Sequence, residues 1–410
     1  MIYTVAGGLW AVVINDFVQL SLALLGALAV AVVVVNASGG MSAMLLKLDD
    51  LARPDLLSLF PWTFNSNGFQ WIGEAGISVS TFLALISLQW WSFRRSDGGG
   101  EFIQRMLATK DEQEAKKAGW VFIVINYLLR SWLWIIVALA ALVLIPEQQD
   151  WEMSYPVLAS KYLPPAMLGL VVVSLVAAFM STVSTSVNWG AGYISHDLYR
   201  RFLRPKARQN ELLFISQLSS IFLLLIGITT ALVSSSIGEV FRLAIAIGTG
   251  PGVVLVLRWF WWRINAAAEL AAMVSGFIVG GVTSVVPLIR IDDYGMRLVV
   301  TTIFTTIVWA SVLIVTPPES EKVLEKFVRK VRPSGPGWQT LRKRFDIQEA
   351  ISISDLLIEF CLASGILYGG LLGIGAFLLH QELGGWIGLI VCIGSFFMMK
   401  GRDYKNLIPG

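Results

Sequence analysis

The sequence predicts an all-α polytopic membrane protein with about ten transmembrane helices. The first observation is composition: 56% of the 410 residues are hydrophobic, 14% are charged, and the mean hydropathy is +0.70. A soluble domain carries roughly 25% charged residues. The second observation is that apolar residues form stretches of about 20, the length a helix needs to cross the hydrocarbon core. The third is that charge alternates from loop to loop, which together with a net charge of +3 argues against a nucleic-acid partner.

The predicted spans follow from apolar stretches separated by polar or charged loops. They lie near 5–35, 69–93, 118–145, 166–190, 210–234, 237–262, 266–289, 297–316, 352–379 and 383–399.

The loops between these spans differ sharply in charge. One set is basic: Arg94, Arg95, Arg105, Lys110, Lys116, Lys117, Arg200, Arg201, Arg204, Lys206, Arg208, Arg258, Arg263, the segment 322–344, Lys400, Arg402 and Lys405. The alternate set is acidic or nearly uncharged: Asp49, Asp50, Asp55, Glu147, Asp150, Glu152, Asp292 and Asp293. The positive-inside rule therefore places both ends of this chain in the cytoplasm. The expected location is the lipid bilayer of a bacterial plasma (inner) membrane.

A run of hydroxyl side chains lies inside the fourth predicted span, between Ser181 and Ser186. Lipid supplies no hydrogen bonds, so each hydroxyl needs a partner. One interpretation is an ion site or an aqueous path. The other is that the hydroxyls bond back to carbonyls of their own helix or to a neighbouring helix.

Four segments of the chain resemble the sodium/solute symporter family. They are Gly7–Val12 with Asn15, Asp16 and Gln19 (family GGLxAVxxTDxxQ, with asparagine in place of threonine), Ile103–Lys110 (IQRxLAAK), Ala178–Tyr199 (MSTxSS…DxY) and Phe260–Asn265 (FWKRVN). They occur in the family's order from the first to the sixth predicted span. Trp259 adjoins the last motif, and Trp261 and Trp262 lie within it. The three are expected to act first as an interfacial anchor and only second as a binding site.

The resemblance implies a LeuT-like inverted repeat of five plus five core helices around a midplane site. The first predicted span then corresponds to the fifth core helix, so the core is expected to be incomplete at its N-terminal side. Residues 1–316 would form the transporter core plus two following helices, 317–350 a charged cytoplasmic loop, and 351–410 a C-terminal helix pair with a short tail.

The same resemblance implies one side of a sodium site. By position, the ligands are the hydroxyls of Ser181 and Thr182 and the carbonyl of Ala178, with the remaining ligands expected on the first core helix. Neutral oxygens of this kind suit a hard cation. Asp16 matches a family aspartate on the inward sodium-release path. The alternative for Asp16 is a carboxylate that stabilises a helix N-terminus at the interface.

The candidate substrate residues are Trp90, Trp91, Tyr127 and Arg130. Arg130 lies mid-span, where an arginine costs roughly 2.5–3.5 kcal/mol to insert. It is expected either to recognise an anionic group of the substrate or to form a structural ion pair with Glu74, Glu239 or a helix outside the chain. The glycine-rich segment after Trp91, Arg94–Gly100, departs from the family pattern and is either a flexible gate or a plain loop.

Gly248–Gly252, around Pro251, predicts either a hinge or broken helix for alternating access or a static kink in the sixth span.

The sequence thus predicts a secondary active transporter that couples Na⁺ to a small organic solute by alternating access, and not an enzyme. The alternatives are a non-transporting membrane sensor module and a remnant. No sodium-dependent uptake is expected from the 410 residues alone, because half of the implied site would precede residue 1.

Overall fold

The computed structural model describes residues 2–402 except 52, 54–55, 58–61, 66–67, 72–77, 89–99 and 235. The chain divides into two compact units, which are described one at a time. The first comprises residues 1–52, 116–235 and 375–381, and the second comprises 53–115, 236–374 and 382–410.

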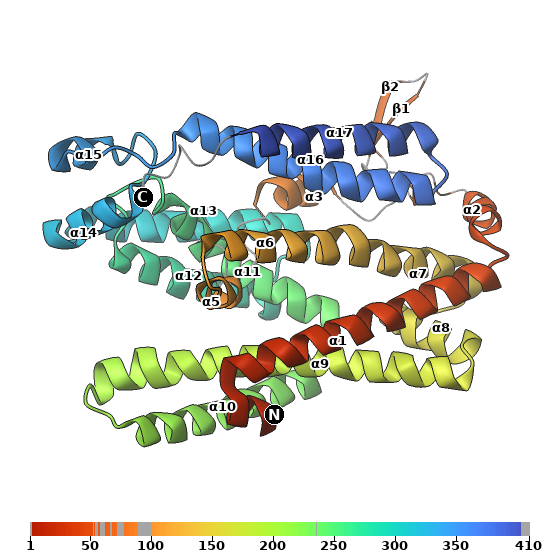
Figure 1. Cartoon of the computed structure of the whole chain (residues 1–410), viewed down its shortest axis with the longest axis horizontal. Coiled ribbons are helices and arrows are strands. Elements are labelled where there is room, and N and C mark those ends of the chain that lie inside the picture. Colours follow the sequence, from red (N-terminus) through yellow and green to blue (C-terminus); the bar gives the residue numbers. More distant parts are fainter. Residues whose placement is uncertain are drawn as a thin grey trace. The chain divides into compact units, whose positions relative to one another are not determined.

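The first unit is built from long helices joined by short connections (Figure 1). In chain order it contains α1 (Ile2–Ala37), α2 (Met41–Asp49), most of α6 (Glu112–Ile123), the π-helix η2 (Val124–Leu129), α7 (Arg130–Leu144), the short 3₁₀ helix η3 (Trp151–Met153), α8 (Ser154–Tyr162), α9 (Pro165–Gly192), the π-helix η4 (Tyr193–Leu203) and α10 (Gln209–Val233). The segments α6, η2 and α7 form one continuous apolar helix, and α9 continues into η4.

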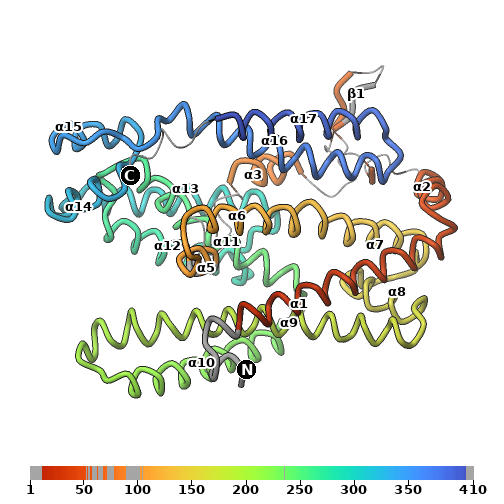
Figure 2. Tube along the Cα trace, in the orientation of Figure 1, coloured from red at the N-terminus to blue at the C-terminus, as the bar shows by residue number. Residues whose placement is uncertain are grey.

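Small residues bring α1 and α9 together. The two helices pack against each other more extensively than any other pair in this unit. Their traces cross in Figure 2. A Cβ on Gly26 would lie 2.2 Å from Ser174 Oγ, and Ala27, Val30 and Ala31 of the same face are almost fully buried. Close backbone approach through small residues is the usual basis of helix association in lipid. This contact positions the hydroxyl run of α9 against α1.

The second unit contains a small hairpin and the remaining helices. The elements are β1 (Trp62–Asn65), β2 (Gly68–Trp71), α3 (Val79–Ser87), α5 (Gly100–Leu107), α11 (Ile237–Leu257), α12 (Ala266–Val285), the 3₁₀ turn η5 (Pro287–Ile289), α13 (Tyr294–Val315), α14 (Glu321–Val331), α15 (Gln339–Phe345), α16 (Ile353–Leu378) and α17 (Glu382–Gly401). β1 and β2 are antiparallel, with Asn65 opposite Gly68.

The core of this unit is a bundle of α11, α12 and α13. Gly280 of α12 lies so close to α11 that a Cβ there would be 2.7 Å from the carbonyl carbon of Ala246. Pro251 lies inside α11, which is assigned as one helix from Ile237 to Leu257. Of the two predictions for Gly248–Gly252, a static kink agrees better with this continuous helix than a break does. A hinge that acts during transport stays a prediction.

The FWWRIN segment ties the C-terminal ends of α11 and α13 to the start of α12. Arg263 Nη2 donates hydrogen bonds to the carbonyls of Leu313 (2.7 Å) and Thr316 (2.6 Å) at the end of α13. Asn265 caps α12 by accepting from Ala268 N (3.0 Å), and it donates to Thr316 Oγ1 (2.9 Å). The motif therefore closes this end of the bundle.

Residues 317–350 form a small folded segment. Leu324, Val328, Trp338 and Leu341 form a buried cluster on which Trp262 also packs. Trp338 Nε1 donates to the carbonyl of Trp259 at 3.0 Å. The tryptophans that follow α11 thus hold the 317–350 segment, a role that the prediction of an interfacial anchor did not include.

The predicted class, an all-α polytopic membrane protein, is confirmed apart from the hairpin. Among the described residues, nine helices are long and apolar enough to cross a membrane, and they match nine of the ten predicted stretches. The fourth stretch ends later than predicted, because η4 extends α9 to Leu203. The start of the stretch 69–93 is wrong, because Gly68–Trp71 is a strand. The rest of that span stays a prediction. Its described helix, α3, has nine residues, and residues 89–99 lie outside the described part.

Candidate functional site

Two of the predicted site residues meet between α1 and α9. Ser181 Oγ donates a hydrogen bond to Asp16 Oδ1 at 2.6 Å, across 165 residues of sequence. Both side chains are half-buried. A hydrogen bond to a carboxylate is roughly twice as strong as one between neutral groups. The structure therefore brings together Ser181, predicted as a sodium ligand, and Asp16, predicted to lie on the release path, which the sequence treated separately.

The other predicted ligands interact within α9. Thr182 Oγ1 donates to the Ala178 carbonyl at 3.1 Å, and Ser184 Oγ donates to the Ser181 carbonyl at 3.1 Å. These are the bonds back to the helix's own carbonyls that the alternative interpretation predicted. The Ser181 hydroxyl, in contrast, reaches a side chain of another helix.

A buried amide lies one turn from Asp16. Gln19 is 6% exposed, and its Oε1 atom has no hydrogen-bond partner among the residues that the structure describes. Residues three apart share one side of a helix, so Gln19 and Asp16 lie on neighbouring parts of the α1 surface. A buried oxygen without a donor costs about 1–3 kcal/mol. Gln19 lies within the first family motif, which implied no role for it. The signal in the sequence was a polar side chain within an apolar span.

Arg130 lies where a π-helix meets an α-helix. Its backbone N–H bonds to the Ile125 carbonyl, five residues back, at the end of η2. Its Nη1 donates to Asn126 Oδ1 at 3.1 Å, and the Tyr127 ring packs edge-on against Phe122 at 5.9 Å. π-helical turns inside α-helices are frequent at functional sites. Trp90, Trp91 and Glu74 lie outside the described residues.

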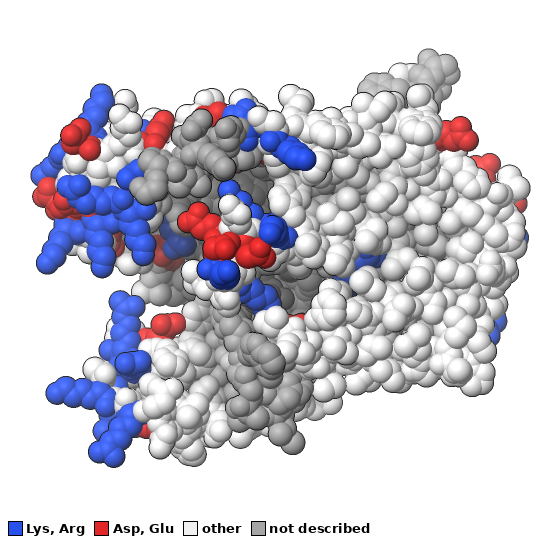
Figure 3. All heavy atoms as spheres, in the orientation of Figure 1, with Lys and Arg blue, Asp and Glu red and all other residues white. Residues whose placement is uncertain are grey.

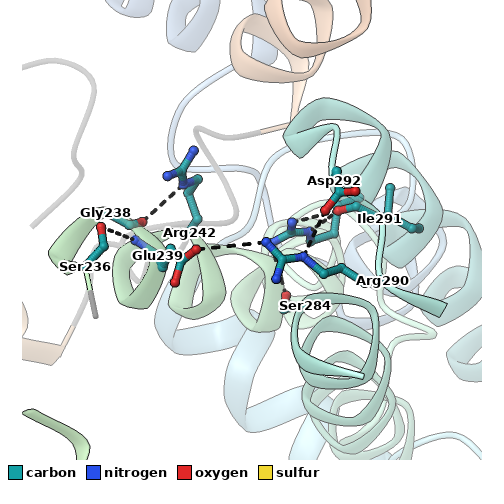
Figure 4. A network of polar contacts seen from close by, with 9 residues as sticks. Ser236, Gly238, Glu239, Arg242, Ser284, Arg290, Ile291 and Asp292 are labelled. Carbon is teal, nitrogen blue, oxygen red and sulfur yellow. Dashed lines mark hydrogen bonds and ion pairs between the residues drawn. The ribbon is translucent and has the colours of Figure 1, made fainter. Parts of the chain in front are cut away.

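Glu239, the other ion-pair partner predicted for Arg130, belongs to a network in the second unit. Figure 4 shows its carboxylate directed toward Arg290, at 3.9 Å. Arg290 also pairs with Asp292 at 2.9 Å, and Arg242 Nε donates to the Gly238 carbonyl at 3.2 Å. The network joins the start of α11 to the loop before α13.

Asp293 links the starts of two helices in the same unit. It caps α13 by accepting from Met296 N at 2.7 Å, and it accepts from Ser78 Oγ at 2.6 Å and Ser80 Oγ at 3.2 Å, just before and within the first turn of α3. The hydrogen bond from Ser78, followed by that from the Met296 amide, lowers the pKa of the Asp293 carboxyl below its ordinary value. The carboxylate is therefore a fixed anion between two helix N-termini.

The helices and the buried oxygens define a polytopic membrane protein with a polar site between two long helices. Residues 1–276 match the sodium:solute symporter family. This match covers more than half of the chain, so the chain belongs to the sodium:solute symporter family, a family of transporters and not of enzymes.

Curated relatives agree with the family assignment. The chain is 28% identical over 284 residues to the osmoregulated proline transporter OpuE of Bacillus subtilis, covering 67% of this chain and 53% of that protein. It is 26% identical to the sodium/glucose cotransporter of Vibrio parahaemolyticus, with the same two coverages of 67% and 53%. It is also 26% identical to human sodium/myo-inositol cotransporter 2, covering 71% of this chain and 46% of that protein. The chain spans about half the length of the curated relatives it matches.

Proposed function

We propose that this chain is part of a secondary active transporter that couples Na⁺ to the uptake of a small organic solute by alternating access. The main support is the contact between Asp16 and Ser181, which joins two positions that the family resemblance assigns to sodium. The names of the relatives, which cover proline, glucose and myo-inositol, support a small polar solute without specifying it.

The chemistry of the α1–α9 site suits a hard monovalent cation. The carboxylate of Asp16, the hydroxyl of Ser181 and the amide oxygen of Gln19 are all oxygen donors. Na⁺ would satisfy the unpartnered Gln19 oxygen and take the place of the hydroxyl proton as the partner of the carboxylate. In this proposal Ser181 is a sodium ligand, together with Thr182 and the Ala178 carbonyl when the Thr182 hydroxyl turns away from that carbonyl.

Recognition of the solute is assigned to Tyr127 and Arg130, together with Trp90 and Trp91. Within the described part of the chain, the hydrogen bond of the Arg130 side chain goes to a neutral amide, so its charge is available to an anionic group of the solute. The π-helical turn supports this assignment because it breaks the regular hydrogen bonding of the helix at that position. A bacterial plasma membrane with both ends of this chain in the cytoplasm is the location proposed from the loop charges.

The sodium site is tested by ion-specific stabilisation of the detergent-solubilised chain. Thermal unfolding is followed by tryptophan fluorescence in NaCl and in KCl at equal ionic strength. A ligand at 100 times its dissociation constant stabilises by about 2.7 kcal/mol. We expect NaCl to raise the unfolding midpoint relative to KCl, and Ser181→Ala and Asp16→Asn each to abolish the difference.

The matched control is Ser220→Ala on α10, whose hydroxyl only bonds back to the Ser216 carbonyl at 2.9 Å. It should keep the full sodium effect. A sodium effect of equal size in Ser181→Ala and in the unchanged chain would contradict the proposed ligand.

A further inference from the structure

The 317–350 segment carries a row of lysines that the transport proposal does not use. Lys322, Lys326 and Lys330 are spaced four residues apart on α14, and all three are exposed. With 3.6 residues per turn they form one stripe on the helix. Leu324 and Val328, which pack on Trp338, lie about 180° around the helix from the middle of this stripe. We call Lys322, Lys326 and Lys330 the lysine stripe.

Four of the five acidic residues of the segment have other partners. Glu325 pairs with Arg329 at 2.8 Å, Glu321 with Arg344 at 2.6 Å and Glu349 with Arg342 at 2.9 Å. Glu319 Oε1 accepts from Ala266 N at 3.1 Å. Within the described part of the chain, no carboxylate lies at ion-pair distance from the lysine stripe. No ion pair with a described residue therefore neutralises the charges of these three lysines.

The segment is fixed next to the ends of membrane helices. Gly337 forms a bridge with Trp261, four residues beyond the end of α11, and a Cβ on Gly337 would lie 2.2 Å from the Phe260 carbonyl. At its other end, α14 begins six residues after α13 ends at Val315. The Arg263 bonds to the Leu313 and Thr316 carbonyls hold that junction. The stripe is therefore carried by a folded platform at the level where helices leave the bilayer.

Basic side chains are concentrated at this place on the surface. Figure 3 shows Lys and Arg crowded over α14 and α15 at the upper left, whereas much of the remaining visible surface carries no charge. Lysine is a compact and strongly hydrated charge, well suited to a phosphate at the membrane surface. Anionic lipids attract such residues by about fivefold in affinity per lysine, provided that the charge lies within roughly 8 Å of the headgroups.

From these observations we infer that the lysine stripe binds the headgroups of anionic phospholipids in the adjoining leaflet. The apolar side of α14 is already covered by Trp338 and Leu341, so the helix does not insert into the bilayer. Binding is electrostatic, and it holds the platform, and with it the ends of α11 and α13, against the membrane surface. This surface is separate from the α1–α9 site, and the inference does not depend on transport.

The test measures binding of single lipids to the full chain in detergent by native mass spectrometry. The probes are phosphatidylglycerol and phosphatidylcholine with identical acyl chains. We expect the first phosphatidylglycerol to bind about tenfold more tightly than phosphatidylcholine, and this preference to weaken as ionic strength rises. Changing Lys322, Lys326 and Lys330 together to Gln should remove the preference. Gln has a helix propensity close to that of Lys, so α14 should remain folded.

Two control variants distinguish lipid binding by the lysine stripe from a general effect of positive charge on the protein. Changing the same three lysines to Arg should keep the preference. Changing Arg200, Arg201 and Lys206 to Gln removes the same charge from exposed positions of the first unit and should also keep it. An unchanged preference in the Lys→Gln triple variant, or an equal loss in the Arg200 control, would overturn the inference. So would loss of a co-purifying acidic protein or nucleic acid from the Lys→Gln variant with lipid binding unaltered.

Discussion

At the scale of single residues, the polar groups inside the apolar helices fall into two kinds. Most hydroxyls, such as those of Thr182, Ser184 and Thr230, bond back to carbonyls of their own helix. Such bonds satisfy the hydroxyl locally and say little about function. Ser181 differs because its partner is the Asp16 carboxylate on another helix. The hydrogen-bond partner of Ser181 is therefore more informative about function than the length of the hydroxyl run.

Asp293 allows a prediction about pH. Its pKa is lowered chiefly by the hydrogen bond from Ser78 and also by that from the Met296 amide, so the folded state favours the ionised carboxyl. A group with a depressed pKa contributes stability that is fully present above its unfolded pKa, which for Asp is about 3.9. That contribution is lost as pH falls through the lower, folded value. We therefore expect the midpoint temperature of thermal unfolding of the detergent-solubilised chain to decrease as the pH is lowered below about 3.9.

Asp293→Asn should lower the midpoint at pH 7 and flatten the acid dependence, because the amide cannot ionise. Asp292→Asn is the neighbouring control: Asp292 is 85% exposed and its described contact is the ion pair with Arg290. An acid profile of Asp293→Asn identical to that of the unchanged chain would contradict the role assigned to the carboxylate.

At the scale of elements, glycines decide how closely helices approach. α11 and α12 are in backbone contact at Gly250, Gly276 and Gly280, where an added Cβ would meet atoms of the facing helix within 3 Å. Close approach of this kind increases van der Waals contact, which is a main source of helix association in lipid. Gly276 and Gly280 of α12 are therefore packing positions.

Two adjacent glycines of α12 allow a matched test. Gly280→Ala places a Cβ 2.7–2.8 Å from the Ala246 carbonyl group, an overpacking that we expect to cost about 1–3 kcal/mol. Gly281→Ala meets nothing within 4 Å and should be neutral, or stabilising by up to about 1 kcal/mol through helix propensity. The apparent midpoints of thermal unfolding in detergent give the comparison. Equal midpoints for the two variants would be inconsistent with the described contact.

At the scale of the whole molecule, the loop charges predict one orientation. The basic loops, including 317–350, should be cytoplasmic, and the loop that contains Gln149 should lie outside. The orientation is tested by labelling single cysteines with a membrane-impermeant maleimide. The cysteines are introduced as Gln149→Cys or Lys343→Cys in a background that carries Cys361→Ala and Cys392→Ala. Gln149→Cys should react in intact cells, whereas Lys343→Cys should react only after lysis. The reverse pattern would show that the proposed orientation is wrong.

The sequence by itself determined the membrane class, nine of the ten spans and the family. Each of these depends on local properties: hydropathy summed over about 20 residues, charges between spans, and short motifs. Pro251 also predicted an irregularity in its helix. The residues around it did not show whether the helix bends there during transport. The hairpin at Trp62–Trp71 was missed, because its aromatic residues continue the apolar pattern of the stretch that follows.

Only the tertiary structure decided which side chains meet. Three hydrogen bonds join residues from 79 to 215 positions apart in the sequence. They link Asp16 to Ser181, Asp293 to Ser78, and Trp338 to Trp259. Membrane helices are apolar on most sides, so periodicity does not specify which face of a helix turns toward which neighbour. Close contacts at small residues such as Gly26 and Gly280 set that rotation, and they exist only when both helices are in place.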